Sequence, residues 1–306
     1  MGDPDELDQT AHGTAVSAPP LQVPIEAAGE RLDWFLASQL GSRSAAARAV
    51  EAGALVDGRV RPKSYRLEGG ERVELPDRVL PPPQPPPEPP RIAWSDEHLA
   101  VVDKPAGLVV HPGAGRPSGT MVDALSGMLA GGEAHRRGIV HRLDRDTSGL
   151  LVVARSEEAF RRLSGLVRRR ELERTYLALV RGHPRSHSGR IEAAIGRDRS
   201  EPTRISLDSD SPRDAVTHFE LVRAWDAHAL LKVKLDTGRM HQIRVHLAAI
   251  DLPIVGDAVY GATDPALSRQ FLHAAGLGFT HPFSGEEVIV SSPLPPELQR
   301  YLDALD

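Results

Sequence analysis

Reactive side chains are concentrated in residues 138–149, whose sequence is GIVHRLDRDTSG. One histidine, two arginines, two aspartates, a threonine and a serine lie between an apolar lead-in and an apolar run. Loops between strands are where a rigid scaffold displays reactive groups. A carboxylate beside arginines stays ionised, as a nucleophile or a proton acceptor must at neutral pH. Residue types and spacing alone leave two interpretations open, a catalytic loop around Asp144 and a structural turn held by salt bridges.

A second candidate segment, residues 238–246, has the sequence GRMHQIRVH. On a helix, His241, Arg244 and Ala248 would share one side, while Gln242 and His246 would share another. Two histidines and two arginines in nine residues indicate contact with an anion or an RNA backbone. The His-x4-His spacing also fits a metal site, but the arginines disfavour a dication and no nearby acid supplies a third ligand.

Two further segments carry weaker signals. Residues 103–113, DKPAGLVVHPG, are typical of a strand end followed by tight turns, and a structural role is expected for most of them. Residues 174–180, RTYLALV, predict a strand that contains Tyr176, and a lone tyrosine in a strand usually belongs to the core. Glycine-rich nucleotide loops and the serine-hydrolase elbow are absent from the sequence.

Composition excludes several classes of site. The 306 residues include no cysteine, which excludes disulfides, zinc–thiolate sites and thiol nucleophiles. No apolar stretch approaches the roughly 18 residues of a membrane span, and the N-terminus lacks a signal-peptide pattern, so a cytoplasmic protein is expected. The net charge is −5, but residues 1–30 hold six acids and no Lys or Arg, so the remainder is near neutral. Basic runs at 59–63 and 168–170 could contact RNA or form solvated faces.

The chain divides into four regions. Residues 1–20 are polar and acidic without periodicity and are expected to be disordered. Residues 21–78 have the texture of a small compact domain that includes a hairpin signal, Asp-Gly, at 57–58. Residues 79–91 are rich in proline and predict an extended linker. Residues 92–306 form the larger domain.

Elements of the small domain follow from local patterns. Leu32, Phe35 and Leu36 lie at i, i+3 and i+4, as one face of a helix would. Ser44 is placed to cap a second helix through the alanine-rich run to Glu51.

The larger domain is predicted to be α+β. Apolar runs at 99–102, 150–154 and 230–235 predict buried strands. Ser156 is a good N-cap for a helix that reaches the arginine cluster at 168–170, and residues 240–249 could form another helix. Strands outnumber helices and do not alternate strictly with them, which favours a large mixed, mainly antiparallel sheet over a doubly wound fold.

Taken together, the four candidate segments resemble the pseudouridine synthases that modify ribosomal RNA of the large subunit, the Rlu-type family. The motif His-Arg-Leu-Asp-x-x-Thr-Ser-Gly is the most specific part of the match. The resemblance covers about residues 92–302 and includes LHA at 272–274, HPFSGE at 281–286 and PLP at 293–295. Residues 21–78 resemble the S4 RNA-binding module, through RLD at 31–33, SR at 42–43 and VDG at 56–58.

The resemblance implies a role for each matching residue. Asp144 would be the catalytic aspartate, and Arg244 would be the basic residue paired with it. Tyr176 would pack beside the target base and move a proton, and Arg142 would help to fill the space left by the flipped nucleotide. Ile243 would be a packing residue. The other residues expected to contact RNA are His141, Arg239, His241, Gln242, Arg43 and Lys63.

Two positions depart from the common pattern of the family. Arg174 stands where lysine is frequent before the tyrosine, which preserves the charge. Met240 stands where a small hydroxyl residue is usual, which removes one possible hydrogen bond. Neither position belongs to the residues assigned to the chemistry.

The implied reaction breaks the N1–C1′ bond of uridine, turns the base and joins C5 to C1′. It is an isomerisation that needs no cofactor, metal or energy source. The uridine must first leave its stack, at a cost of roughly a few kcal/mol. One carboxylate then adds to the sugar or base, or abstracts a sugar proton, and the sequence leaves this step of Asp144 open. An arginine partner would orient the carboxylate by bidentate hydrogen bonds.

RNA is the implied partner, with large-subunit (23S) ribosomal RNA as the first expectation and tRNA as the second. A monomer without membrane contact is expected, and the S4 module with its basic runs predicts salt-sensitive binding. The alternative from another class is a non-catalytic RNA-binding or ribosome-assembly factor on the same scaffold. The intact set of Asp144, Tyr176 and Arg244 argues against it. A metal-dependent hydrolase, which a chelator would reveal, is the weaker alternative.

Overall fold

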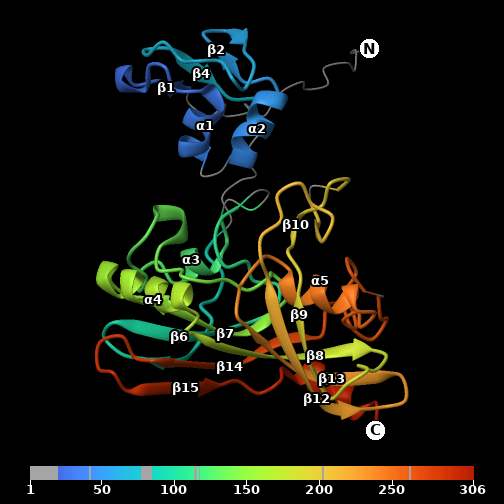
Figure 1. The fold of residues 1–306 in the computed structure, drawn as a ribbon. Coiled ribbons are helices and arrows are strands. Elements are labelled where there is room, and N and C mark those ends of the chain that lie inside the picture. Colours follow the sequence, from blue (N-terminus) through green and yellow to red (C-terminus); the bar gives the residue numbers. More distant parts are fainter. Residues whose placement is uncertain are drawn as a thin grey trace, which may run out of the picture. The chain divides into compact units, whose positions relative to one another are not determined.

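The fold is described from a computed structural model that covers residues 20–40, 43–76, 85–113, 116, 118–201, 203–261 and 263–306, without the side chains of residues 43 and 44. The chain forms two compact units, and the main break between them falls between Gln84 and Pro85 (Figure 1). This break lies within the region expected to be a linker. The expected tail, residues 1–20, and the first part of that linker lie almost entirely outside the described residues. Within the described part of the chain, no helix has the length and apolar character needed to cross a bilayer.

The smaller unit combines two helices with a four-stranded antiparallel sheet in the order β1-β4-β2-β3. Leu32, Phe35 and Leu36 are buried on one face of the first helix, as predicted. The second helix begins one residue before Ser44, so the prediction that Ser44 precedes and caps it was wrong. The bounds are α1 Leu32–Leu40, α2 Arg43–Glu51, β1 Leu21–Gln22, β2 Leu55–Val56, β3 Arg59–Val60, β4 Arg72–Glu74 and the 3-10 turn η1 Ile25–Ala27.

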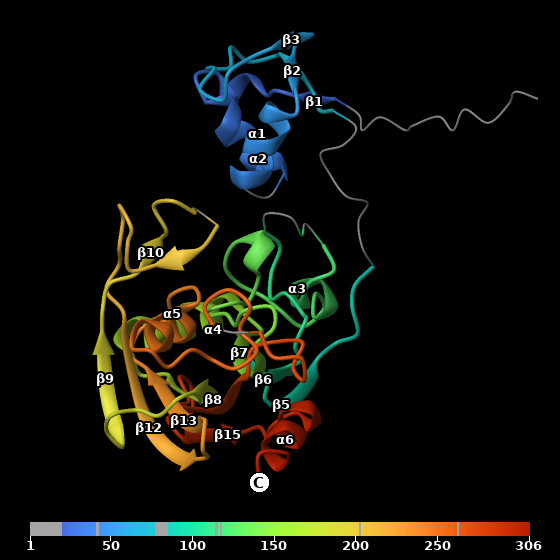
Figure 2. The same ribbon diagram turned by 90° about the vertical axis from the view of Figure 1, so that its right-hand side faces the viewer.

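The larger unit is built on a nine-stranded sheet in the order β5-β6-β7-β14-β8-β13-β12-β9, with β15 paired to β14 (Figure 1). Only β7 and β14 are parallel neighbours, and all other described pairs are antiparallel. The α+β prediction is therefore confirmed. The bounds are β5 Arg91–Ser95, β6 Leu99–Lys104, β7 Ser148–Ala154, β8 Glu173–Arg181, β9 Ser188–Glu192, β12 Val216–Ala224, β13 His228–Leu235, β14 Leu272–Thr280 and β15 Glu287–Ser291. A two-stranded hairpin, β10 Gly196–Arg197 with β11 Ile205–Ser206, extends beyond one end of β9 (Figures 1 and 2).

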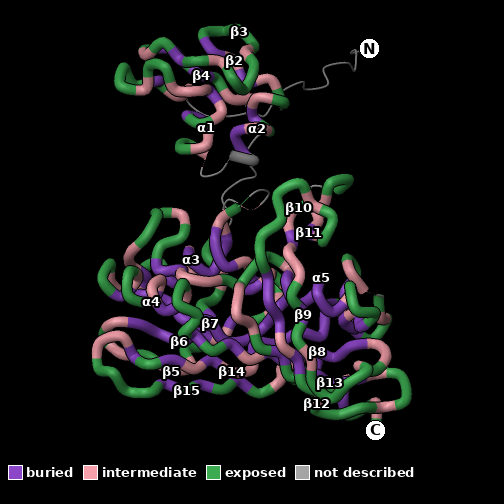
Figure 3. The backbone as a smooth tube through the Cα atoms, viewed as in Figure 1, coloured by how far each residue is buried: buried purple, intermediate pink, exposed green. Residues whose placement is uncertain are grey.

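Helices cover the central strands on both faces. Alternate residues of β6 enter different cores: Leu99 and Val101 pack in the cluster that contains α4, whereas Ala100 and Val102 pack in the cluster that contains α3, α5 and α6. This two-sided burial explains why the strands read as continuous apolar runs, and Figure 3 shows buried backbone along them. The bounds are α3 Met121–Ala124, the 3-10 turn η2 Ala134–Arg136, α4 Glu157–Arg169, α5 Gln242–Ala249 and α6 Pro296–Asp303.

The start of α4 confirms one sequence prediction, and the start of α5 corrects another. Ser156 Oγ accepts a hydrogen bond of 3.1 Å from the backbone N of Ala159, as expected of an N-cap. Helix α5 begins at Gln242 instead of Met240, because His241 adopts a left-handed conformation with φ of 55°. His241 therefore does not lie on the helix that carries Arg244.

Gly149, the second residue of β7, permits the parallel pairing of β7 with β14. Its φ is +112°, and a Cβ atom built on it would lie 2.3 Å from the carbonyl oxygen of Ala274. A side chain at this position would force the two strands apart. The final glycine of the motif is therefore required by the close approach of two strands that lie far apart in the sequence.

Candidate active site

All four candidate segments meet around one pocket of about 500 Å³ in the larger unit. The polar loop before β7 forms one wall, and the start of β8 and the turn before α5 form others. The residues predicted for the site that line the pocket are His141, Arg142, Asp144, Tyr176, Arg239, His241, Gln242, Ile243 and Arg244.

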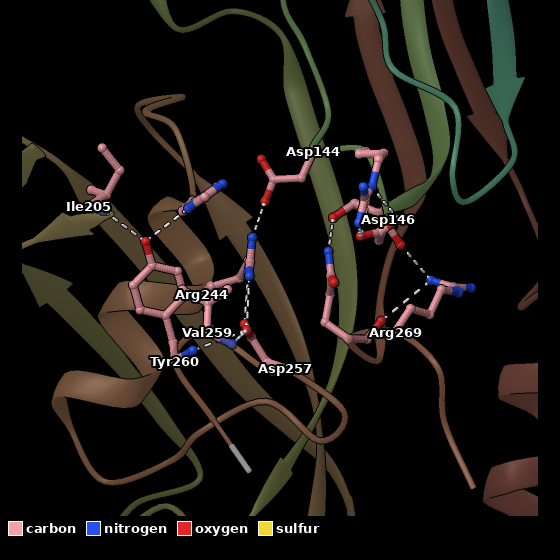
Figure 4. A network of polar contacts seen from close by, with 12 residues as sticks. Asp144, Asp146, Ile205, Arg244, Asp257, Val259, Tyr260 and Arg269 are labelled. Atoms are coloured by element: carbon pink, nitrogen blue, oxygen red, sulfur yellow. Dashed lines mark hydrogen bonds and ion pairs between the residues drawn. The ribbon is translucent and has the colours of Figure 1, made fainter. Parts of the chain in front are cut away.

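Asp144, Arg244 and Asp257 form a connected network at this pocket (Figure 4). Arg244 donates from Nη1 to Asp144 Oδ2 at 3.2 Å, and from Nε and Nη2 to the two carboxylate oxygens of Asp257 at 2.7 and 2.8 Å. The side chain of Asp257 is 0% exposed, that of Arg244 is 8% exposed and that of Asp144 is 17% exposed. The buried Asp257 thus fixes the guanidinium, which presents one N–H group to the more accessible Asp144.

The charges of the buried pair are mutually stabilised. Burial opposes the charge on Arg244, but the hydrogen bonds and charge of Asp257, followed by those of Asp144, outweigh it and raise the pKa of the guanidinium. Burial likewise opposes the charge on Asp257, but Arg244 and the backbone N–H groups of Val259 and Tyr260 lower its pKa. Both groups are therefore charged at neutral pH. Asp144 Oδ1 has no hydrogen-bond partner among the described residues and is free to meet a substrate.

Tyr176 contributes a protonated hydroxyl to the same pocket. The residue lies on β8 and is 5% exposed, and burial raises the pKa of its phenol above the ordinary value, with the charge of Arg174 acting in the opposite direction. Its hydroxyl makes no hydrogen bond to any part of the chain that the structure describes. A buried tyrosine hydroxyl usually has a partner, so this one is available to a bound molecule.

Comparisons with known proteins show the family to which the chain belongs. Residues 98–249 match the family described as RNA pseudouridylate synthase. The chain is 42% identical to ribosomal large subunit pseudouridine synthase D of Xanthomonas campestris, over 97% of the chain and 96% of that protein. The chain belongs to the RNA pseudouridine synthases. An uncharacterised RNA pseudouridine synthase of Chloroflexus aurantiacus is 45% identical, over 92% of each chain. The solved structure of human RNA pseudouridylate synthase domain containing 1 matches with a TM-score of 0.56 and 26% identity, over 71% of this chain and 95% of that one.

Membership of this family makes the protein an isomerase and confirms the resemblance drawn from the four segments. The S4 resemblance of residues 21–78 stays a prediction. Of the two residues predicted to contact RNA in that unit, Lys63 is exposed. The side chain of Arg43 lies outside the described residues.

Arg142 lies at the edge of the pocket beside a histidine that the sequence analysis did not select. Its Nη1 is 3.5 Å from His111 Nε2. Burial, followed by the charge of Arg142, lowers the pKa of His111 to about 4. His111 is therefore neutral at neutral pH, and its Nε2 can accept a hydrogen bond from the guanidinium of Arg142. Only the position of His111 before a proline in a turn-rich segment marked it in the sequence.

His241 points its ring towards Tyr260, a second residue that sequence reasoning missed. Its Nδ1 lies 2.9 Å from the Tyr260 hydroxyl, which also accepts from the backbone N of Ile205 (Figure 4). Burial lowers the pKa of His241. The Tyr260 hydroxyl can thus donate a hydrogen bond to Nδ1 of the neutral ring, which places the ring proton on Nε2.

Two residues predicted to contact RNA form hydrogen bonds within the protein. Gln242 is 2% exposed, and its amide accepts from Thr237 Oγ1 and Arg239 N and donates to Val216 O and Thr217 Oγ1. His141 Nε2 accepts from the backbone N of Val152 at 3.1 Å, and burial lowers its pKa to about 3. Both side chains thus support loops of the pocket that they line, and their contact with RNA stays a prediction.

The remaining predicted residues keep positions that suit their expected roles. Ile243 is buried and packs at the pocket. Arg239 is exposed, and its Nε donates to the carbonyl of Asp214 at 3.1 Å. Among the described residues, no group of three or more histidines and acids is arranged to hold a metal ion.

The side chains of Lys104 and Arg269 form hydrogen bonds with the loop that contains Asp144. Neither residue was predicted from the sequence as part of the site. Lys104 is fully buried and donates to the carbonyls of Pro105, Leu108 and Arg145 at 2.8, 2.9 and 2.9 Å. Burial lowers its pKa to about 7, against the charges of nearby aspartates. Arg269 donates to the carbonyl of Asp146 at 3.0 Å, to Ser148 Oγ and to Glu297 of α6. The loop is thus fixed on both sides of its motif.

We expect Lys104→Met to lower the free energy of unfolding by about 3 kcal/mol, because three carbonyl groups lose their donor: that of Leu108 in a buried bond and those of Pro105 and Arg145 in part-buried bonds. Pseudouridine formation should fall as well, since the carbonyl of Arg145 adjoins Asp144. Urea denaturation measures the first effect. Lys232→Met, which changes an exposed lysine, is the matched control and should shift stability by less than about 0.5 kcal/mol. An unchanged urea midpoint in Lys104→Met would contradict the assigned contacts.

Proposed function

We propose that this isomerase forms pseudouridine in large-subunit ribosomal RNA, with Asp144 as the catalytic carboxylate. The observation that carries the assignment is the geometry of Asp144, which lines a pocket of about 500 Å³. One of its carboxylate oxygens is held by Arg244 at 3.2 Å, and the other has no hydrogen-bond partner among the described residues. The name of the Xanthomonas campestris relative supports the ribosomal substrate. The action on ribosomal RNA would place the protein in the cytoplasm.

Each pocket residue has a step that its geometry suits. Arg244, anchored by Asp257, keeps Asp144 ionised and oriented while the carboxylate adds to the nucleotide or removes a proton from its sugar. Tyr176 contacts the flipped base and supplies a proton donor. Arg142, at the pocket edge, would occupy the stack that the uridine leaves. Residues 21–78, as an S4 module with Lys63 and Arg43, would add phosphate contacts.

The test uses a large-subunit ribosomal RNA transcript labelled with tritium at uridine C5. Formation of the new C5–C1′ bond displaces that tritium, so the wild-type protein should release it without added cofactor. Mapping pseudouridines in cells with and without the protein then identifies the uridine. A wild-type protein that binds the transcript but forms no pseudouridine would instead be an RNA-binding or assembly factor. Activity confined to tRNA would overturn the ribosomal substrate alone.

Tyr176→Phe should lower the turnover rate by about 10²-fold, within the range typical of a lost proton donor, while thermal stability stays unchanged. Thermal stability should stay the same, since the Tyr176 hydroxyl forms no hydrogen bond with the described residues that the substitution could remove. Tritium release and thermal unfolding measure the two effects. Tyr301→Phe is the matched control, since that hydroxyl bonds Asp264 at 2.8 Å away from the pocket. The role assigned to Tyr176 fails if turnover is unaffected.

A further inference from the structure

Arg174 is a buried cation in the pocket wall that the assignments above leave without a role. It lies on β8 two residues before Tyr176, and side chains two apart on a strand share a face. The residue is 6% exposed and lines the pocket together with Asp144 and Tyr176. A positive charge is thus held beside the space that the nucleotide would enter.

The guanidinium of Arg174 has few partners of its own. Its Nη2 donates to the carbonyl of Leu235 at 3.3 Å. Its Nε is buried without a hydrogen-bond partner, and no carboxylate of the described residues lies within ion-pair distance. A buried charge without a counter-charge is costly. The site therefore favours a ligand that brings negative charge.

The surroundings of Arg174 indicate which anion this ligand presents. Arg168 and Arg170, at the end of α4, also line the pocket and form no ion pair within the described chain, although the intervening Arg169 is paired with Glu171 at 2.7 Å. Guanidinium groups bind phosphate oxygens through parallel N–H groups. A neutral uracil carbonyl would accept a hydrogen bond but would not balance the charge.

We propose that Arg174, with Arg168 and Arg170 at the rim, forms a phosphate subsite that holds the RNA backbone beside the uridine pocket. This inference rests on the proposed function, because it takes RNA as the ligand. Arg174 would be a binding residue and not a catalytic one. Because Arg174 and Tyr176 share one face of β8, binding of the RNA phosphate by Arg174 would help to position the base beside Tyr176.

Gly238 provides a way to move the guanidinium without removing its charge. A Cβ atom at Gly238 would lie 2.7 Å from Arg174 Nη1; apart from the two chain neighbours of Gly238, the only other heavy atom of the described residues within 4 Å is Arg174 Cζ at 3.8 Å. The φ of Gly238 lies outside the left-handed region, so alanine fits its backbone. Gly238→Ala should therefore displace the tip of Arg174 and leave the fold intact.

The test measures the dissociation constant for a large-subunit ribosomal RNA transcript against salt, with every variant placed in an Asp144→Asn background so that no turnover occurs. Arg174→Met should weaken binding by about tenfold, as expected for one charge-assisted contact. It should also reduce the slope of log Kd against log salt by about 0.7 to 0.9, the share of one phosphate. Its thermal stability should not fall, because an uncompensated buried charge is removed. Arg185→Met, an exposed arginine beyond the far end of β8, should change neither binding value.

Gly238→Ala should also weaken RNA binding. If Arg174→Met fails to fold, the result for Gly238→Ala tests the phosphate subsite by itself. Unchanged binding in both variants, or an equal change in Arg185→Met, would overturn the subsite. Weaker binding with an unchanged salt slope would also overturn it, since the contact would then be to a neutral group. Tritium release by the protein with Asp144 intact tests the proposed function separately, so an active enzyme whose binding ignores Arg174 would contradict only the subsite.

Discussion

Replacing Asp144 by asparagine is expected to lower pseudouridine formation by at least about 10²–10⁴-fold, the range for loss of a positioned acid–base group, while RNA binding is retained. The amide has nearly the same shape and can still accept a hydrogen bond from Arg244. It cannot act as a nucleophile or accept a proton at neutral pH. Tritium release and RNA binding, measured on the same preparations, separate the two effects.

Asp146→Asn is the matched control for that experiment, because it changes an aspartate of the same loop. Its carboxylate pairs with the exposed Arg145 and does not line the pocket. Turnover should stay within a few-fold of the wild type. Near-normal turnover in Asp144→Asn, or an equal loss in Asp146→Asn, would disprove the assignment of the catalytic carboxylate.

Asp257→Asn should lower the free energy of unfolding by about 3–5 kcal/mol, because breaking a buried ion pair leaves the charge of its partner uncompensated. An amide in place of the carboxylate turns an N–H group towards an N–H group of Arg244. The guanidinium then loses its anchor, so the orientation of Asp144 and the turnover rate should suffer as well. Urea denaturation checks the first effect, with Asp226→Asn as an exposed control expected to stay within about 0.5 kcal/mol.

The difference in the free energy of unfolding between wild type and Asp257→Asn should decrease as the pH falls into the acid range. The folded protein holds the pKa of Asp257 below its ordinary value of 3.8. A carboxyl group whose pKa is lowered in the folded state stabilises the protein, and this contribution is complete at pH values above the pKa of the unfolded state. It is lost as the pH falls through the pKa of the folded state. The difference should thus be constant from pH 5 to 7 and shrink below about pH 4. A difference that grows in acid would show that Asp257 is not ionised in the fold.

Local sequence patterns predicted several helices and strands, but they could not predict the hydrogen-bond network around Asp144. The strands β6, β7 and β13 and the helix α4 follow from apolar runs and one capping serine, which are short-range features. Asp144 and Arg244 are 100 residues apart, and only the family resemblance paired them. Asp257 stood in no motif, because a lone aspartate before a turn gives no sign that the fold will bury it against an arginine.

The contacts of the polar side chains could not be predicted from the sequence. Polar residues in a crowded loop look alike in sequence, but their backbone geometry decides which groups each side chain contacts. The ring of His141 accepts a hydrogen bond from the backbone N of Val152, and the side chain of Gln242 donates one to the carbonyl of Val216. The left-handed conformation of His241 starts α5 late and redirects its ring to Tyr260.

The parallel pairing of β7 with β14 bears on how this chain is made. Protein synthesis delivers the N-terminal part first, so β7 and β8 emerge long before β14, the strand that lies between them. Contacts between such distant segments form slowly, and until then both strands present unpaired edges that invite aggregation. Arg244, Asp257 and Arg269 arrive in the same late portion of the chain. A nascent protein therefore carries the whole motif around Asp144 for much of its synthesis without the residues that complete the pocket network, and we expect activity only after the last strands have paired.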